Sequence, residues 1–481
     1  MTPLELLAAF EADERAVQQA LSDHGLLRPD PNLGRLERFS GLFRDVLTLP
    51  DAELCVALEA RLAAGEDPDA SPGHFDMSPL QVCFRDGKLN ALRMLLRAGA
   101  RTRWNKDERA IALGNVPTAP DTDQADLFLF ACRVGNLDAA KSYASSSQAW
   151  CARSSESLTE AVRAGASPIV AWLMDNGFDP NAVDDIGRGA LELAVDRNDV
   201  TTAELLLSHG ADPFGPPEKD YSSAVDKVRG APMRALFVRY GVNPGRLAFE
   251  TSVEHVPFPS LAERPLTSEN FAQNRSARAG QANPERFLPD FWSEQIRTGR
   301  YASPTDWKTP RDRAQPIWSF QRYGRSVTPL PDGRLVFVGG EHEDWYDPDF
   351  CIYADVTVLN RDGGVDHYIY PEDVFPPTDF HSATLIGGLI WLVGGLGYPK
   401  SRRNGETPVY TLDVETFSIQ KIALTGEAPG WIHRHRAVLS GTEIIVSGGK
   451  IEPGYRDNDD LFGLDLGTLS WRRIGRSAPP A

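Results

Sequence analysis

The 481-residue sequence predicts a multidomain α + β protein, with a helical repeat region in its first half and an antiparallel β region in its second. A chain of this length is too long to enclose one hydrophobic core, so at least two domains are expected. Apolar helical stretches that stop at a glycine recur in the first half, whereas short apolar strands that end in a glycine pair recur in the second. These two repeats define the two predicted modules.

Four stretches that end alike carry the helical repeat. In each, apolar residues at i, i+3 and i+4 form one helix face, and a glycine supplies the left-handed residue that ends the helix. The stretches are LRMLLRAGARTRWN (92–105), IVAWLMDNGFDPNAVD (169–184), TAELLLSHGADPFG (202–215) and MRALFVRYGVNPGR (233–246). The glycines Gly177, Gly210 and Gly241 follow one another at nearly equal intervals, and almost the same interval separates Gly65 from Gly99.

This interval of about 33 residues resembles the period of the ankyrin repeat. Ser78, Pro79 and Leu80, followed by Gln81, stand where that family usually has Thr-Pro-Leu-His. The resemblance implies an α-solenoid of five or six ankyrin repeats over 49–246, with an insertion near 106–126 and a helical N-terminal cap over 1–48. Such repeats present an extended concave surface that suits protein partners.

Residues 247–315 are expected to connect the two modules. Prolines, serines and arginines favour loops there, but the segment also contains aromatic residues such as Phe291, Trp292 and Trp307. Exposed aromatic residues at this density would promote aggregation. We therefore expect a helix near 284–300 that docks between the two halves and fixes their angle.

The β repeat is marked by three glycine pairs, which recur at almost equal intervals at 339–340, 394–395 and 448–449. Each pair ends an apolar strand and is followed by a polar loop, another strand and a hairpin. In the third unit the hairpin carries Asp465, Thr468 and Trp471. This pattern resembles the kelch repeat, a four-stranded propeller blade of about 50 residues. The resemblance implies that 316–481 is a kelch-like antiparallel β region.

About three blades can be counted, which gives an open or partial propeller because closed propellers usually have four to eight. We expect an open fan that the aromatic connecting segment and the ankyrin end seal. Alternatively, extra strands from 285–324 or blades from a second chain close the ring. His381 and His435 precede their glycine pairs by the same distance in sequence, and Arg325 with Ser326 takes that place in the first unit. We expect the two histidines to pack between blades.

The loops that follow the glycine pairs are expected on one face of the fan, and they hold the candidate binding residues. Carboxylates with interleaved aromatic residues are typical of an interface with anchors inside a charged rim. The candidates are Glu341, His342, Glu343, Asp344, Trp345, Tyr346, Asp347, Asp349, Phe350, Lys400, Arg402, Arg403 and Tyr455.

Three other interpretations of the acidic loop stay open. The first is a metal site, but the loop lacks the HExxH spacing of zinc enzymes and the Gly and Glu positions of an EF-hand. A glycosidase would need two carboxylates at a fixed separation. The third is a solvated loop without a partner. We predict no metal and no cofactor.

The formal net charge of −17 disfavours nucleic acid and anionic membrane surfaces as partners. Five widely spaced cysteines without a CxxC motif, an acidic amphipathic N-terminus and no long apolar run predict a cytoplasmic protein. We expect a non-enzymatic protein-interaction protein whose partner is basic, for example a toxin neutralised by an immunity protein. The alternative is an enzyme or metal-binding protein that uses the loop face, with His342, His381 and His435 as acid/base groups.

Overall fold

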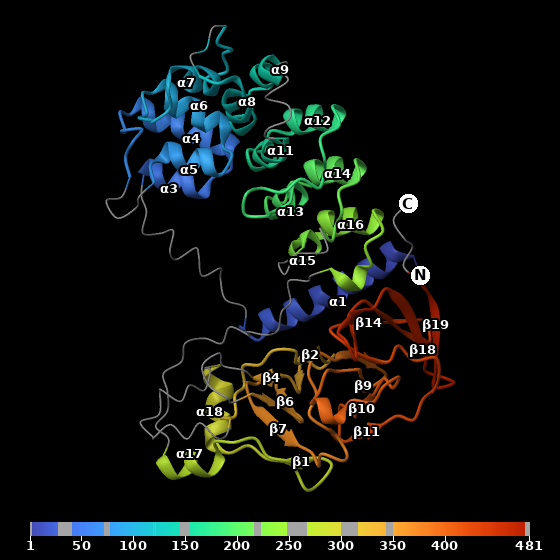
Figure 1. Ribbon diagram of the computed structural model, residues 1–481. Coiled ribbons are helices and arrows are strands. Elements are labelled where there is room, and N and C mark those ends of the chain that lie inside the picture. The colour runs from blue at the N-terminus through green and yellow to red at the C-terminus, as the bar shows by residue number, and fades with distance from the viewer. Residues whose placement is uncertain are drawn as a thin grey trace. The chain divides into compact units, whose positions relative to one another are not determined.

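The protein has a helical N-terminal half and a β-sheet C-terminal region (Figure 1). The computed structural model describes residues 2–26, 41–71, 77–118, 120, 122–144, 154–215, 223–247, 267–299, 316–342 and 350–476. The chain divides into two compact units, one formed by residues 29–237 and the other by residues 1–28 together with 238–481. No helix in these ranges is both long enough and apolar enough to cross a membrane.

The unit of residues 29–237 consists of short helices that pack in consecutive pairs, such as α5 with α6, α8 with α9 and α13 with α14. The helices are α3 (Gly41–Thr48), α4 (Asp51–Ala63), α5 (Pro79–Arg85), α6 (Leu89–Arg97), α7 (Lys106–Ala112), α8 (Gln124–Arg133), α9 (Leu137–Ala144), α11 (Ser154–Arg163), α12 (Ser167–Asp175), α13 (Ala190–Asp196), α14 (Val200–Ser208), α15 (Ala224–Lys227) and α16 (Ala231–Arg239), in which the unit ends. Each helix buries an apolar face, as its spacing predicts.

Local signals in the sequence set the helix ends. The hydroxyl of Ser78 accepts a hydrogen bond from the backbone of Gln81, and the Gln81 side chain accepts one from Ser78, which forms a capping box at the start of α5. Gly177 has a φ of +79° just after α12, a conformation in which only glycine is unstrained. The amide of Gly177 donates to the carbonyl of Met174 and closes the helix end.

The segment 106–126 differs in part from the surface insertion that we expect from the sequence. Residues 106–112 form α7, which Asn105 and Glu108 cap, and Ile111 and Ala112 are fully buried. Helix α7 packs against α8. This part of the segment therefore belongs to the helical core, because its capping box starts a helix with a buried apolar face.

The other unit contains three main sheets, each built on four antiparallel strands that follow one another in chain order, and two smaller sheets of three and two strands. Sheet 1 holds β2 (Ser326–Pro329), β3 (Leu335–Val338), β6 (Asp355–Leu359) and β7 (Val365–Ile369); sheet 2 holds β8 (Ser382–Ile386), β9 (Leu389–Val393), β10 (Val409–Asp413) and β11 (Ile419–Lys421); sheet 3 holds β14 (Arg436–Ser440), β15 (Glu443–Ser447), β18 (Asp460–Asp465) and β19 (Ser470–Arg476). Strand β1 (Glu285–Arg286) extends sheet 1 beside β7, and β12 (Thr425–Gly426) extends sheet 3 beside β19. In the described residues the sheets do not close into a barrel.

The hairpins of sheets 2 and 3 share one turn. Asp413 accepts hydrogen bonds from the backbone and hydroxyl of Thr416, and Asp465 accepts the same pair from Thr468. Both bonds hold the chain in a tight Asx-type turn between the third and fourth strands. The spacing of Asp and Thr in the sequence therefore has a local cause.

Helix α1 (Pro3–Asp23) differs from the N-terminal cap expected over 1–48. It contacts β2, β14 and the 3-10 turn η1 (Pro244–Arg246) (Figure 1). Val17 and Leu21 belong to the hydrophobic core of sheet 1. Its amphipathic pattern predicts a buried face but not the partner that buries it, and that partner is the β unit.

Helix α18 (Asp290–Thr298) lies within the range 284–300 expected for a docking helix, and α17 (Ser268–Asn274) packs beside it. The rings of Trp292 and Trp318 stack with centroids 4.6 Å apart, and Phe291 and Ile296 complete the contact with the core of sheet 1. This packing explains the aromatic residues of the connecting segment. The proposed effect on the angle between the two halves stays a prediction.

Candidate functional site

The loops after the glycine pairs leave all three sheets at equivalent positions. Strands β2, β8 and β14 begin opposite the ends of β3, β9 and β15, with Ser326 paired to Val338 and Ser382 to Val393. Each loop therefore starts beside the first residue of the first strand of its sheet. We call the surface formed by residues 341–342, 350–352, 396–408 and 450–459 the loop face.

The glycine pairs are required because a neighbouring backbone approaches them. A Cβ atom on Gly339 would lie 2.3 Å from the carbonyl oxygen of Thr378, and one on Gly394 would lie 2.4 Å from that of Ile432. A Cβ on Gly448 would meet the carbonyl of Gly245 in η1 at 2.3 Å. In sheets 1 and 2 the approaching segment is the stretch of chain just before the first strand of the next sheet, with Thr378 before β8 and Ile432 before β14. In sheet 3, η1 takes its place.

The first part of the loop face is a short hairpin of β4 (Glu341–His342) and β5 (Cys351–Ile352). The backbone of Glu341 exchanges two hydrogen bonds with Tyr323, and His342 is fully buried. Six of the candidate residues lie outside the described residues: Glu343, Asp344, Trp345, Tyr346, Asp347 and Asp349. Their role stays a prediction.

The first and second loops touch each other through Tyr398. The backbone amide of Ile352 donates a hydrogen bond of 2.9 Å to the Tyr398 hydroxyl, and the ring of Phe350 lies edge-on with its centroid 6.0 Å from that of Tyr398. Phe350 remains 41% exposed. An aromatic side chain is thus held on the surface by a second aromatic ring.

The second loop reaches the third through Arg402, which donates to the carbonyls of Leu396 and Gly397 and lies 3.8 Å from the carboxylate of Glu452. Lys400 precedes it in the turn η3 (Pro399–Ser401), and both Lys400 and Arg403 are exposed. The loop face therefore brings the first predicted loop into contact with the second, and the second into contact with the third.

Tyr455 lies between β16 (Lys450–Glu452) and β17 (Arg456–Asp457) in the third loop, and 53% of it is exposed. The ammonium of Lys450 lies 4.9 Å from its ring centroid, and the ring of His433 lies 5.6 Å away. His433 is on β13 (Trp431–His433), which pairs with β16. The Tyr455 ring is consequently supported on one side and open to solvent on the other.

Asp379 lies in this region but is not among the candidate binding residues predicted from the sequence. It is fully buried and accepts a hydrogen bond of 2.7 Å from the amide of Gly397 in the second loop. Burial raises its pKa, while that amide and a hydrogen bond with Glu341 act in the opposite direction. Asp379 thus connects the first two loops at their base. The signal in the sequence was its place in the stretch YPEDVFPPTDFH (370–381), which mixes carboxylates with aromatic residues.

His381 and His435 connect neighbouring sheets. The Nε2 of His381 lies 2.8 Å from the hydroxyl of Ser326, and the Nε2 of His435 lies 2.9 Å from that of Ser382. Burial lowers the pKa of His381 to about 4 and that of His435 to about 3. In the described part of the chain neither Nδ1 atom has a hydrogen-bond partner. The carboxylate that orients the histidine of a catalytic triad is therefore missing at both.

The residues just before these positions share a left-handed backbone. Gly324, Phe380 and Arg434 have φ angles of +62°, +52° and +57°. The amide of Phe380 donates to the carbonyl of Gly324 at 2.6 Å, and that of Arg434 donates to Phe380 at 2.9 Å. Backbone hydrogen bonds from sheet to sheet thus hold two non-glycine residues in a strained conformation.

No group of three or more His, Cys, Asp or Glu side chains suited to a metal ion occurs within the residues that the structure describes. The described carboxylates at the loop face are instead used in contacts with protein groups. Asp457, for example, pairs with Lys450 at 2.6 Å and with Arg246 at 3.3 Å.

Over 63 residues, 13% of its length, the chain is 41% identical to cyclin-dependent kinase inhibitor 2A of Monodelphis domestica, an ankyrin-repeat protein. The match covers 36% of that protein, so the chain spans about a third of the relative that it matches. No model of a known protein family matches the chain. The partial similarity agrees with the helical N-terminal region of the chain.

Proposed function

We propose that this chain is a non-enzymatic protein-interaction protein with two binding surfaces. One is a stack of ankyrin-type repeats over 49–246, and the other is the loop face of three kelch-type blades in 316–481. The partial match to an ankyrin-repeat protein supports the first surface. The equivalent positions of the three loops support the second.

The observation that carries the loop-face proposal is the exposure of Phe350 and Tyr455. Large aromatic side chains are enriched among the residues that contribute most to protein–protein binding. Both rings are positioned by neighbours, Phe350 by Tyr398 and Tyr455 by Lys450, so little side-chain entropy remains to be lost when a partner binds.

We further propose that the partner is a basic protein, in the manner of a toxin neutralised by an immunity protein in the cytoplasm. The net charge of −17 would raise the rate of association with a cationic protein. The acidic residues Glu343, Asp344, Asp347 and Asp349 would add to that attraction near Phe350.

The test begins with capture of partners from native host extract by the intact chain and by the double variant Phe350→Ala/Tyr455→Ala. The control is Ile474→Ala, which removes an apolar side chain of similar exposure, 40%, from β19. We expect the double variant to lose the partner and the control to keep it. An identical set of captured proteins for all three chains would exclude the loop face.

The basic-partner proposal is tested with the purified partner. Its affinity is measured at about 50 mM and 300 mM salt, over which electrostatic attraction between exposed charges is increasingly screened. We expect weaker binding at high salt and for a variant with Glu343, Asp344, Asp347 and Asp349 changed to Asn or Gln. Binding that does not depend on salt would contradict the basic-partner proposal.

A further inference from the structure

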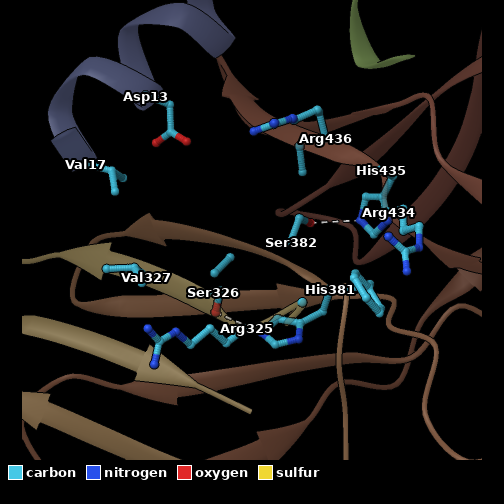
Figure 2. Close-up of a pocket in the computed structure, with 14 residues that line it drawn as sticks. Asp13, Val17, Arg325, Ser326, Val327, His381, Ser382, Arg434, His435 and Arg436 are labelled. Atoms are coloured by element: carbon cyan, nitrogen blue, oxygen red, sulfur yellow. Dashed lines mark hydrogen bonds between the residues drawn. The ribbon is translucent and has the colours of Figure 1, made fainter. Parts of the chain in front are cut away.

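A pocket of about 270 Å³ lies where the three sheets meet α1. The starts of β2, β8 and β14 line it, together with Asp13 and Val17 of α1. Figure 2 shows Asp13 and Arg436 pointing toward one another across this space, with Ser382 and His435 joined by a hydrogen bond. These strand starts pair with the ends of β3, β9 and β15, from which the loops of the loop face leave, so the pocket lies at that end of the sheets.

The lining of the pocket has more positive than negative charge. Arg325, Arg434 and Arg436 line it, and Asp13 is the one carboxylate among its lining residues. His381 and His435 are neutral at pH 7 because burial lowers the pKa of each to about 4 and about 3. In a protein with a net charge of −17 this is a local site of positive charge.

Two of the arginines are held by aromatic rings. The guanidinium carbon of Arg434 lies 3.5 Å from the ring centroid of Phe380, and that of Arg325 lies 4.7 Å from that of Phe320. Stacking uses the face of a guanidinium and leaves its N–H donors in the plane of the group. A ring-stacked Arg434 is therefore oriented for an anion without a further loss of side-chain freedom.

The third arginine, Arg436, faces the carboxylate of Asp13 on α1. Desolvation beside the sheets raises the pKa of Asp13, and Arg436 acts in the opposite direction. Arg436 opens β14 as Ser326 opens β2 and Ser382 opens β8. Each serine faces a histidine of the next sheet, whereas Arg436 faces Asp13 of α1. Helix α1 therefore supplies the contact that a further sheet would otherwise make.

We propose that the pocket binds a small anionic group, a carboxylate or a phosphate, against Arg434 and Arg436, and that Asp13 is the chain's own anion that this ligand displaces. The volume is slightly below the range of about 300–1,000 Å³ typical of pockets for drug-sized ligands. It suits a small ion or a single acidic side chain. Left-handed Phe380 and Arg434 agree with this role, since backbone strain concentrates at ligand sites.

Titration calorimetry on the full chain tests the site with three probes at constant ionic strength: inorganic phosphate, acetate, and glutamate blocked at both ends. Phosphate and acetate represent free anions, and blocked glutamate represents an acidic side chain of a partner. We expect one probe to bind with one site per chain. The preferred probe identifies the source of the anion.

Variants decide whether the binding belongs to this pocket. Arg436→Gln removes a charged donor and should weaken binding about tenfold or more, and Arg434→Gln should do the same. Asp13→Asn removes the internal competitor and should strengthen binding at least about threefold, by the loss of like-charge repulsion. The matched control is Arg472→Gln on β19, whose partner is Glu443 outside the pocket, and it should bind as the parent does.

If Arg436→Gln does not fold, as judged by circular dichroism, Asp13→Asn decides alone, because an amide replaces a carboxylate of nearly equal size. Equal affinity of the parent, Arg434→Gln and Asp13→Asn would overturn the proposal. So would the absence of binding by both the parent and Asp13→Asn for all three probes. Anion binding here does not depend on whether the loop face binds a protein.

Discussion

The Nε2 of His381 on sheet 2 lies 2.8 Å from the hydroxyl of Ser326 on sheet 1. His435 and Ser382 repeat the contact between sheets 3 and 2 at 2.9 Å. Both pairs are largely buried, so each replaces hydrogen bonds to water with one bond between sheets. These two contacts link each sheet to its neighbour, and we expect the packing of the sheets to depend on them.

Ser326→Ala tests this dependence. The substitution leaves the buried Nε2 of His381 without its partner, and we expect the free energy of unfolding to fall by about 1–3 kcal/mol. Urea unfolding followed by tryptophan fluorescence measures the change. Ser440→Ala, at the other end of β14, is the control and should cost less than about 0.5 kcal/mol. Equal midpoints for the two variants would show that the contact does not stabilise the unit.

The same histidines predict the effect of acid. Their folded pKa values, about 4 for His381 and about 3 for His435, lie below the unfolded value of about 6.5. The unfolded chain therefore binds protons first, so their contribution is complete above about pH 6.5 and is lost as the pH falls toward 4 and 3. Each histidine should give a slope of about 1.4 kcal/mol per pH unit between these limits.

Urea unfolding at pH 7.5, 6.5, 5.5 and 4.5 measures this slope. Acidic groups such as Asp355 also contribute, so the parent is compared with His435→Gln. We expect the variant to lose stability less steeply with falling pH than the parent. Parallel curves would show that His435 is protonated equally in the folded and unfolded chains.

Glycine substitutions separate backbone strain from the close approach of a neighbouring backbone segment. Gly394 and Gly387 have similar left-handed φ angles of +66° and +57°, but a Cβ would meet the carbonyl of Ile432 at 2.4 Å only in the first case. Gly387→Ala should cost about 1–2 kcal/mol from strain alone. Gly394→Ala should cost at least about 3 kcal/mol, because overpacking adds to strain. Thermal unfolding of both variants provides the comparison, and equal losses would mean that the neighbouring backbone moves away freely.

The ion pair of Arg322 and Asp355 is buried, with side chains 4% and 6% exposed. Burial alone would raise the pKa of Asp355, but Arg322 and His367 together hold it below its usual range. Asp355→Ala would leave Arg322 charged without its partner, and we expect a loss of about 3–5 kcal/mol. Asp460→Asn, which breaks the more exposed pair with Arg473, should cost less than about 1 kcal/mol. Denaturant titration of both variants measures the two losses, and a larger loss for Asp460→Asn than for Asp355→Ala would contradict the prediction.

Local signals in the sequence are sufficient to predict a helical first half and a β-sheet second half. The glycine pair at 394–395 ends a strand because no side chain fits beside Ile432, and Gly177 ends a helix because its backbone is left-handed. The constraint at Gly177 acts between close neighbours in the chain, whereas Ile432 is distant from Gly394 in the sequence, but both constraints select a glycine. They can be recognised from one sequence.

Contacts between distant segments could not be predicted in this way. The spacing of Val17 and Leu21 predicts an apolar helix face, but the sequence does not say that sheet 1 covers it. Asp379 and Arg434 show no local pattern either, since a left-handed non-glycine residue and a buried carboxylate are set by the neighbouring sheet. Phe350, Arg402 and Tyr455 were chosen as candidates because aromatic and charged residues stand out in a polar loop, and their role in binding stays a prediction.

The β unit is discontinuous, since residues 1–28 fold with 238–481. During synthesis α1 leaves the ribosome long before β2 and β14 are made, so its apolar face must wait for partners that lie in the second half of the chain. Contacts of such high sequence separation form slowly. A recombinant fragment that starts at 238 would expose the edges that α1 covers, whereas a direct fusion of 1–28 to 238–481 would restore them.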